Sequence, residues 1–255
     1  MNYLIVILLF ILGSVLGSFL ACMGYRIPNK IKTTHPASFC ENCKGKLKWY
    51  MNIPIISYIF LKGKCYYCHK PIGFIYFLSE LICGILFVTN YLIYGFSMNF
   101  FVGIILTCIL IVTIVSDFKY YYISDRVLLI STALLLITFL VFMDYSDLIM
   151  RVVSALILFL VMIGLKIMGN AMFNTESLGD GDIKLMAVIG LAMGMLNSFI
   201  SLFFAAVIGL IFSLFTLKKN KEGIIPFGPF IIMGALLVIY LSNYIVPYME
   251  ELLSI

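Results

Sequence analysis

Long apolar runs separated by short polar segments set the pattern of this chain. Most of the runs hold about 17–22 residues, the length that an α-helix needs to cross the hydrocarbon core of a bilayer. The sixth run is shorter, and we place its boundary with the seventh near Asn197 and Ser198. The pattern predicts an all-α polytopic membrane protein with about eight transmembrane helices. The runs cover residues 3–23, 74–94, 98–116, 127–143, 148–168, 183–197, 198–217 and 229–246.

The composition agrees with a membrane protein. Of the 255 residues, 63% are hydrophobic and 11% are charged, and the mean hydropathy is +1.12. A soluble domain has roughly 45–50% apolar and about 25% charged residues, so a soluble fold is excluded. The first run lacks the basic residues and the small-residue cleavage site of a signal peptide, and we expect it to stay as a transmembrane helix.

The distribution of positive charge predicts the orientation in the membrane. The net charge is +5, and 16 of the 17 Lys and Arg residues fall in four polar segments, with Arg151 as the exception. Positive residues are retained on the cytoplasmic side, so both termini are expected on the outer side of the plasma membrane. The positive charge is therefore a topology signal, and no nucleic-acid partner is expected. The cytoplasmic segments are residues 24–73, 117–126, 166–184 and 218–228.

Residues 24–73, called the cysteine segment below, carry two Cys-x-x-Cys pairs. Four thiolates make a closed tetrahedral zinc site that has no open position for catalysis. Gly45 and Gly63 flank the pairs, where tight turns are expected. Disulfides are disfavoured in a reducing cytosol. A segment this short cannot form a sufficient hydrophobic core, so a cross-link such as a bound metal is needed to stabilise it. The sequence predicts a structural Zn²⁺ rather than four free thiols, and the expected ligands are Cys40, Cys43, Cys65 and Cys68.

Other residues of the cysteine segment have simpler interpretations. His35 and His69 are expected to be polar surface residues and not metal ligands. Residues 52–61 are too short to span a bilayer and too apolar to be freely solvated. They are expected to lie against the membrane interface or against the helices.

Two acidic clusters lie at edges of apolar runs that the topology places on the cytoplasmic side. Asp117 follows one run, and Asp180 and Asp182 precede another. A carboxylate near hydrocarbon is costly, so such residues indicate a function by default. Asp180 or Asp182 could simply cap a helix N-terminus, but Asp117 sits at a helix C-terminus, where the helix dipole disfavours an anion. Paired carboxylates suggest that the site activates water as aspartic proteases do.

Three further residues are candidates to line the same site. Glu80 lies inside the second run, where a buried carboxylate faces a cavity or has a partner, so a site role and an interhelical hydrogen bond are both open. Gly179 and Gly181 permit a close backbone approach, which suits a groove for an extended peptide.

A set of short motifs follows in order along nearly the whole chain. It comprises Gly17-Ser18-Phe19, Arg26-Ile27-Pro28, Pro36-x-Ser38-x-Cys40-x-x-Cys43, Asn52-Ile53-Pro54, Leu61-x-Gly63-x-Cys65-x-x-Cys68, Tyr76, Glu80, Asp117, Gly179-x-Gly181-Asp182-x-Lys184 and Pro226-Phe227-Gly228-Pro229-Phe230. No single motif is decisive, but the ordered set is specific. Together the motifs resemble those of the prepilin peptidases, also called type 4 prepilin leader peptidases.

This resemblance implies a polytopic aspartic protease in which Asp117 and Asp182 are the catalytic pair. Lys184 belongs to the motif of Asp182. Asp125 is the second choice for the first acid, in a segment where the family usually reads Ile-Pro-Asp and this chain has Ser124 in place of the proline. The position of Asp125 in the cytosolic loop argues against it. Some family members lack the cysteines, which implies that the zinc is structural.

The resemblance also implies the substrate and the division of the chain. Family substrates are type IV prepilins and pseudopilins, whose short basic leader ends in glycine before an apolar helix and is cut at the cytoplasmic face. Many members then N-methylate the new N-terminus with S-adenosylmethionine, although no conventional motif for that cofactor is present here. The expected parts are a first transmembrane helix (1–23), a zinc-knuckle domain (24–73) and a transmembrane aspartic peptidase domain (74–255).

Three other classes fit part of the sequence. A presenilin-like intramembrane protease shares the Gly-x-Gly-Asp motif but lacks the cysteine segment. An ion-coupled transporter would place its acidic residues near the midplane on broken helices. A zinc-knuckle scaffold would leave Asp117 and Glu80 without a role.

In the peptidase interpretation, Asp182 at a helix N-terminus holds the negative charge and Asp117 holds the shared proton.

Overall fold

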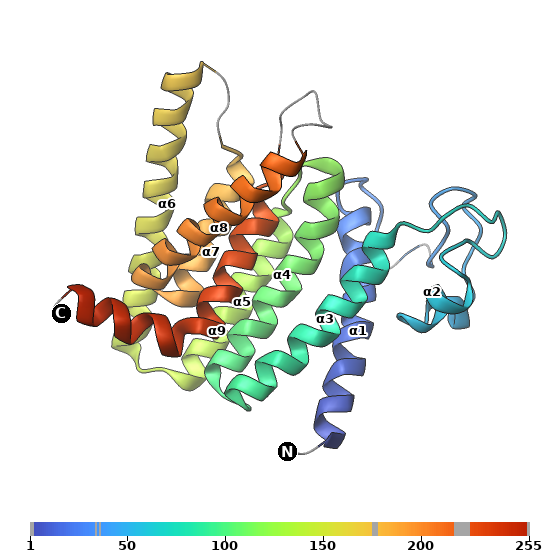
Figure 1. Cartoon of the computed structure of the whole chain (residues 1–255), viewed down its shortest axis with the longest axis horizontal. Helices are drawn as coiled ribbons and strands as arrows, with labels where there is room; N and C mark the ends of the chain where they lie inside the picture. Colours follow the sequence, from blue (N-terminus) through green and yellow to red (C-terminus); the bar gives the residue numbers. More distant parts are fainter. Residues whose placement is uncertain (1–2, 34, 36, 175–177, 217–224, 254–255) are drawn as a thin grey trace. The chain divides into compact units, whose positions relative to one another are not determined.

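The computed structural model describes residues 3–33, 35, 37–174, 178–216 and 225–253 (Figure 1). Pro36 of the first cysteine motif and residues 218–224 of the last basic segment lie outside this range. The chain divides into two compact units. Unit 1 comprises residues 1–95 and 111–122, and unit 2 comprises residues 96–110 and 123–255. The division therefore falls inside one helix, α4 (Met98–Tyr120).

The described chain is helical, and its long helices follow the apolar runs. Six of the described helices are long and apolar enough to cross a membrane, namely α1, α3, α4, α5, α6 and α8. Helix α7 has 14 residues, and the apolar stretch Gly228–Leu241 of α9 is also short. The predicted all-α polytopic fold is confirmed. The elements are α1 (Tyr3–Arg26), the 3-10 helix η1 (Trp49–Asn52), α2 (Ile56–Phe60), α3 (Phe74–Tyr94), α4 (Met98–Tyr120), α5 (Asp125–Phe142), α6 (Tyr145–Phe173), α7 (Asp180–Met193), α8 (Met195–Thr216) and α9 (Gly228–Leu253).

Three helix boundaries differ from the sequence prediction. Helix α4 continues past its apolar run, so Asp117 lies within the last helical turn and not after it. Helix α5 begins at Asp125, so this residue starts a helix and does not lie in the loop. The boundary placed near Asn197 and Ser198 was wrong, because Gly194 with φ +78° ends α7 earlier. The apolar run continues without a break across this helix end, so the end can be recognised only from the left-handed backbone of the glycine.

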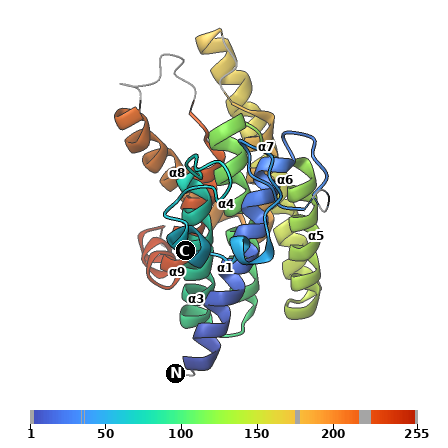
Figure 2. The same ribbon diagram turned by 90° about the vertical axis from the view of Figure 1, so that its right-hand side faces the viewer.

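In unit 1, α1 and α3 lie side by side and antiparallel (Figure 1 and Figure 2). A Cβ atom added at Gly13 would lie 2.9 Å from the carbonyl oxygen of Cys83. One added at Gly17 would lie 2.8 Å from the Cβ of Cys83 and 3.0 Å from the carbonyl oxygen of Ser79. Small residues that let two backbones approach closely are a common basis of helix association in membranes. The α1–α3 pair thus forms the frame to which both ends of the cysteine segment are attached.

We expect Gly17→Ala to destabilise the protein, because the new methyl group meets backbone atoms of α3 that cannot move aside as a side-chain tip can. Overpacking of this kind costs about 1–3 kcal/mol, which corresponds to a fall in Tm of about 2–10 °C for a chain of this size. Thermal unfolding in detergent measures the effect. Gly164→Ala in α6 is the matched control, since an added Cβ there meets no atom within 4 Å. An equal fall in Tm for both variants would contradict the packing argument.

In unit 2, α7 occupies the centre and contacts α5, α6, α8 and α9. With 14 residues, α7 is too short to cross a bilayer. It is surrounded by protein and not by lipid, so its length does not need to match the hydrocarbon thickness. Gly190 of α7 packs against Ala155 of α6, where an added Cβ would lie 2.9 Å from the Cα of Ala155. The helices around α7 therefore fix the position of its first turn within unit 2. The buried residues of α7 are Ile183, Leu185, Met186, Val188, Ile189, Gly190, Leu191, Ala192 and Met193.

Candidate active site and metal centre

The first predicted catalytic residue, Asp117, lies in unit 1 and is 5% exposed. Its backbone carbonyl accepts a hydrogen bond of 3.0 Å from the N–H of Tyr121, which closes the last turn of α4. Just before this turn, Gly24 of α1 packs against α4. A Cβ added at Gly24 would lie 2.7 Å from the carbonyl oxygen of Val112 and 2.8 Å from the Cβ of Val115. Asp117 is thus a buried carboxyl group at a helix C-terminus that a neighbouring helix supports.

The second predicted catalytic residue, Asp182, lies in the first turn of α7, in unit 2. Gly179 precedes the helix in an extended conformation, and a Cβ added there would lie 3.2 Å from Oδ2 of Asp182. The carboxylate therefore folds back towards the helix N-terminus, where the helix dipole favours an anion. A Cβ added at Gly181 would lie 2.8 Å from the Cβ of Ile123. Gly181 thus packs closely against the side chain of Ile123.

Two lysines of unit 2 form ion pairs with the other acidic residues of these segments. The Nζ atom of Lys166 lies 2.6 Å from Oδ1 of Asp180, and that of Lys184 lies 2.7 Å from Oδ1 of Asp125. Both carboxylates are exposed, so solvent screens both pairs. The Lys184–Asp125 pair joins the first turn of α7 to the start of α5. It brings together two residues that the sequence assigned to the edge of the site.

Glu80 lies in unit 1 on α3 and connects three parts of that unit. Its Oε2 atom accepts a hydrogen bond of 2.7 Å from the N–H of Ile55, and the side chain of Ser18 on α1 lies near its carboxylate. Glu80 therefore has a partner in the cysteine segment and a polar neighbour on α1. Ile55 has φ +63° and ψ −53°, a conformation that a β-branched residue rarely adopts and that is common near functional sites. Glu80 thus holds a strained turn of the cysteine segment against the helices.

The apolar stretch of the cysteine segment has two faces. The ring of Tyr58 stacks on Phe77 of α3, with a distance of 4.9 Å between ring centroids. The side chains of Ile59 and Phe60 point away from the helices and are 60% and 82% exposed. The stretch therefore packs against α3 on one side and leaves an apolar surface on the other.

The four cysteines of the two pairs meet at one point of unit 1. Their Sγ atoms all lie within 4.8 Å of one another, and the distances are 3.9 Å between Cys40 and Cys68 and 4.0 Å between Cys43 and Cys65. A tetrahedral site with Zn–S bonds of about 2.3 Å requires sulfur–sulfur distances of about 3.8 Å. The four thiols therefore fit a Zn²⁺ ion, as the sequence predicts.

Both Cys-x-x-Cys turns have the same backbone hydrogen bonds. In each turn the N–H of the first cysteine donates to the carbonyl five residues later, and the residue after the second cysteine donates to the carbonyl of the first. That last residue adopts the left-handed conformation, Lys44 with φ 58° and His69 with φ 55°. Gly45 is not left-handed, but its carbonyl closes the first turn by accepting the hydrogen bond from Cys40. A Cβ added at Gly45 would lie 3.0 Å from Cδ2 of Tyr67 and 3.3 Å from the Sγ of Cys43.

The surroundings of Cys65 prepare it to act as a ligand. Burial opposes ionisation of this thiol, but the backbone N–H groups of Cys68 and Tyr67 stabilise its thiolate, and the pKa of Cys65 falls to about 7. Metal ligands of this kind must be deprotonated, so a thiolate is available near neutral pH. His35 and His69 are exposed, and the cluster contains cysteines alone.

Arg151 has a role that the sequence did not reveal. Its guanidinium donates a hydrogen bond to the carbonyl of Ala192, in the last turn of α7, and lies 5.3 Å from the centroid of the Phe139 ring. It satisfies a carbonyl that the end of α7 leaves without an intrahelical partner. The one feature of the sequence that could have drawn attention to Arg151 is its isolation from all other Lys and Arg residues.

The helices, the carboxylates at their ends and the four-thiol cluster define a multi-pass α-helical membrane protein with a metal-type site. Comparison with known families identifies which one. The N-terminal part, residues 11–94, matches the bacterial peptidase A24 N-terminal domain, and residues 104–214 match the type IV leader peptidase family. The chain belongs to the type IV leader peptidase family, and it is an inner-membrane multi-pass peptidase.

Curated relatives cover nearly the whole chain. A prepilin leader peptidase/N-methyltransferase of Bacillus subtilis (strain 168) is 32% identical over 253 residues, which is 94% of this chain and 96% of the relative. A protein of the same name from Vibrio cholerae is 28% identical, over 94% of this chain and 98% of the relative. A type 4 prepilin-like proteins leader peptide-processing enzyme of Escherichia coli is 28% identical, over 90% and 91%. No solved structure matches the chain.

Proposed function

We propose that this chain cleaves the leader peptide of type IV prepilins or pseudopilins after a glycine, at the cytoplasmic face of the membrane. Similarity over the full length to enzymes named prepilin leader peptidase/N-methyltransferase carries the proposal. The burial of Asp117 at the end of an apolar helix supports it. A leader that precedes an apolar helix is cut where the bilayer meets water, and the end of a membrane helix is such a place.

Asp117 and Asp182 are the proposed catalytic pair. Asp182 at the N-terminus of α7 favours the negative charge, whereas Asp117 at the C-terminus of α4 favours the neutral acid. Ionised Asp182 takes a proton from a water molecule, whose oxygen attacks the scissile carbonyl carbon while Asp117 protonates the carbonyl oxygen. The tetrahedral intermediate then collapses. Its hydroxyl proton returns to Asp117, and Asp182 gives its proton to the leaving amine as the C–N bond breaks.

The remaining site candidates are proposed to line the peptide groove. Gly179 and Gly181 are proposed to keep the chain beside Asp182 free of side chains, so that an extended substrate backbone could approach it. Lys184 and Asp125 form the ion pair that fixes the edge of α7. In unit 1, Glu80 is proposed as a site residue that holds the strained turn at Ile55.

The proposed orientation has both termini outside and the active site facing the cytoplasm. It rests on the retention of positively charged segments inside the cell. The cysteine segment carries nine of the Lys and Arg residues, and Asp117 lies at the end of α4 that is followed by the next basic segment. Residues 24–73 are then a cytoplasmic metal-binding domain, and residues 74–255 form the peptidase domain.

Zn²⁺ is the proposed metal of the four-cysteine cluster, with a structural role. The ion supplies four metal–thiolate bonds, which tie the two turns together. Beyond the end of α1, the described residues of the cysteine segment form only the short helices η1 and α2. So small a segment has little core of its own, and a metal would take its place. The residues that would hold the ion are Cys40, Cys43, Cys65 and Cys68.

Methylation of the new N-terminus is a second candidate activity, because the curated relatives' names include N-methyltransferase. The methyl donor would be S-adenosylmethionine. The described residues offer no glycine-rich strand–turn–helix that would cradle this molecule, since their only β structure is two isolated bridges. No residue is therefore assigned to the methyl donor.

One assay tests both activities. The purified protein is incubated with a prepilin whose basic leader ends in glycine, with and without S-adenosylmethionine, and the product is weighed by mass spectrometry. We expect cleavage directly after the glycine, and a product one methyl group heavier only when S-adenosylmethionine is present. Cleavage inside the apolar helix of the substrate would instead support a presenilin-like protease. An intact substrate would contradict the proposed function.

A further inference from the structure

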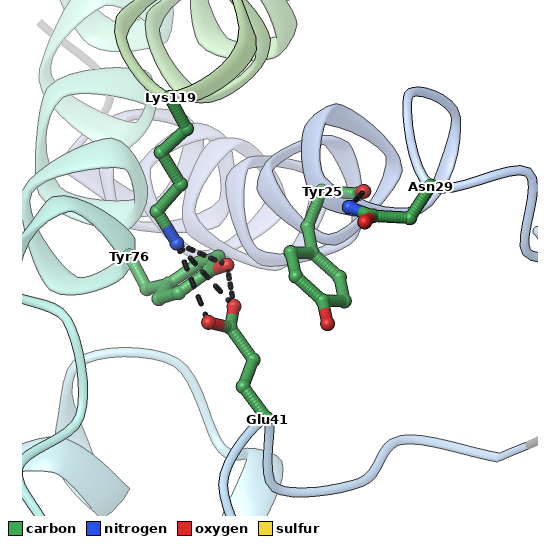
Figure 3. Close-up of polar contacts among 5 residues, drawn as sticks. All are labelled: Tyr25, Asn29, Glu41, Tyr76 and Lys119. Carbon is green, nitrogen blue, oxygen red and sulfur yellow. Dashed lines mark hydrogen bonds and ion pairs between the residues drawn. The ribbon is translucent and has the colours of Figure 1, made fainter.

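Three side chains from separate parts of unit 1 meet at one point (Figure 3). Glu41 lies between the first two cysteines, Tyr76 lies in the first turn of α3, and Lys119 lies in the last turn of α4. The Nζ atom of Lys119 lies 3.4 and 3.5 Å from the two carboxylate oxygens of Glu41 and donates to the Tyr76 hydroxyl at 3.1 Å. The Tyr76 hydroxyl in turn donates to Glu41. Lys119 also lies over the Tyr76 ring, 4.7 Å from its centroid.

The position of Glu41 is set by the first Cys-x-x-Cys turn. The N–H of Cys40 donates to the carbonyl of Gly45 at 3.0 Å, and the N–H of Lys44 donates to the carbonyl of Cys40 at 2.9 Å. Glu41 is also the only acidic residue of the cysteine segment, which holds nine Lys and Arg residues. The single carboxylate of a strongly basic segment thus contacts Lys119 of α4 from a turn that backbone hydrogen bonds hold in shape.

Asp117 lies between two points at which α4 is held in unit 1. On one side of Asp117 in the sequence, Gly24 of α1 packs against Val112 and Val115. On the other side, Lys119 is bound by Glu41 and Tyr76. The last turn of a helix frays readily when nothing holds it, because its final carbonyls lack intrahelical partners. The contact at Lys119 therefore limits the motion of the turn that carries Asp117.

The energy of this contact is too small for a main role in folding. The side chains of Lys119 and Glu41 are 29% and 37% exposed, and ion pairs that water reaches contribute little to the free energy of unfolding. A small displacement of a reacting group has a much larger effect on rate, since a misplacement of about 1 Å can cost about 100-fold. The contact is therefore expected to affect the reaction more than the stability.

We propose that Glu41 is a positioning residue that couples the metal centre to the end of α4 and so fixes the orientation of the Asp117 carboxyl group. The inference rests on the proposed function, because it needs Asp117 to be a reacting group. It gives the four-cysteine site a second role besides holding its own segment together. Metal binding then orders the turn at Cys40, and the ordered turn presents Glu41 to Lys119.

The test compares the steady-state cleavage kinetics of four full-length variants. Glu41→Gln removes the charge and keeps the shape, and we expect kcat to fall about 10- to 100-fold while KM stays within about twofold, because substrate binding is unchanged. The reversed pair, Glu41→Lys with Lys119→Glu, should recover most of the lost kcat. Asn42→Ala is the matched control, since Asn42 is the other residue between the two cysteines and is exposed. Its kcat should equal that of the parent.

Two further measurements separate positioning from folding and from the proposed function. Zinc content and Tm of Glu41→Gln should match those of the parent; a loss of zinc in proportion to the loss of kcat would overturn the positioning role. Asp117→Asn serves as the reference. If Asp117→Asn is inactive and Glu41→Gln has the parental kcat, the positioning role is overturned and the proposed function stands. If Asp117→Asn remains active, both the catalytic assignment and the positioning role are overturned.

Discussion

Asp117→Asn and Asp182→Asn are each expected to abolish measurable prepilin cleavage while the protein still inserts into the membrane. An amide has nearly the shape of the acid but cannot exchange the proton that either step of the hydrolysis needs. General acid–base groups contribute about 100- to 10,000-fold to a rate, and each residue serves in both halves of the proposed reaction. The measurement is the rate of product formation from a purified prepilin, with the amount of folded enzyme normalised by size-exclusion chromatography.

Two other acidic residues make this prediction specific. Asp144→Asn changes an exposed residue that precedes α6, and it should cleave at the parental rate. Asp125→Asn breaks the ion pair with Lys184 and should have a smaller effect than either catalytic variant. An active Asp117→Asn together with an inactive Asp125→Asn would transfer the role of first acid to Asp125.

Removal of the metal is expected to unfold the cysteine segment and leave the helices in place. Structural Zn²⁺ sites contribute about 10–16 kcal/mol of apparent binding free energy in small peptides, and this segment has little other structure to retain. Loss of one ligand, as in Cys65→Ser, should have the same effect as a strong chelator. Trypsin measures it directly, because the segment contains eight lysines that become cleavable when the turns open. The close packing of α1 on α3 at Gly13 and Gly17 does not involve the metal.

Cys108→Ser is the matched control for this experiment. Cys108 lies on α4 and outside the four-cysteine cluster, so the variant should keep the parental zinc content and the parental resistance to trypsin. Acidification should also release the metal, because protons compete with Zn²⁺ for thiolates. A purified protein without bound metal whose cysteine segment still resists trypsin would contradict the structural role of zinc.

Local features of the sequence were enough to predict the class of the protein. A run of about 20 apolar residues can satisfy its backbone in a bilayer only as a helix, so the long helices follow from composition. The four cysteines were also predictable, because zinc coordination depends on ligand type and spacing. The ends of helices were harder to place. Gly194 ends α7 inside an apolar run, and only its backbone conformation distinguishes it from a glycine within a helix.

Partners that are distant in the sequence account for what could not be predicted. Glu80 could be read as a site residue or as an interhelical partner, and only the fold shows its hydrogen bond to Ile55. Asp125 looked like a loop residue until the start of α5 placed it against Lys184. Neither contact has a sequence signal, because each depends on which distant segments of the chain pack together.

The sequence by itself determined that this is a multi-pass membrane protein, that four cysteines form one metal-type site, and that Asp117 and Asp182 lie at helix ends. Each of these follows from residue type and local spacing, which act within a few turns of the chain. The tertiary structure alone decided that Glu41 reaches Lys119 from 78 residues away and that Arg151 closes the end of α7. Such contacts are set by the packing of helices, and helix packing depends on the shapes of whole surfaces and not on any short motif.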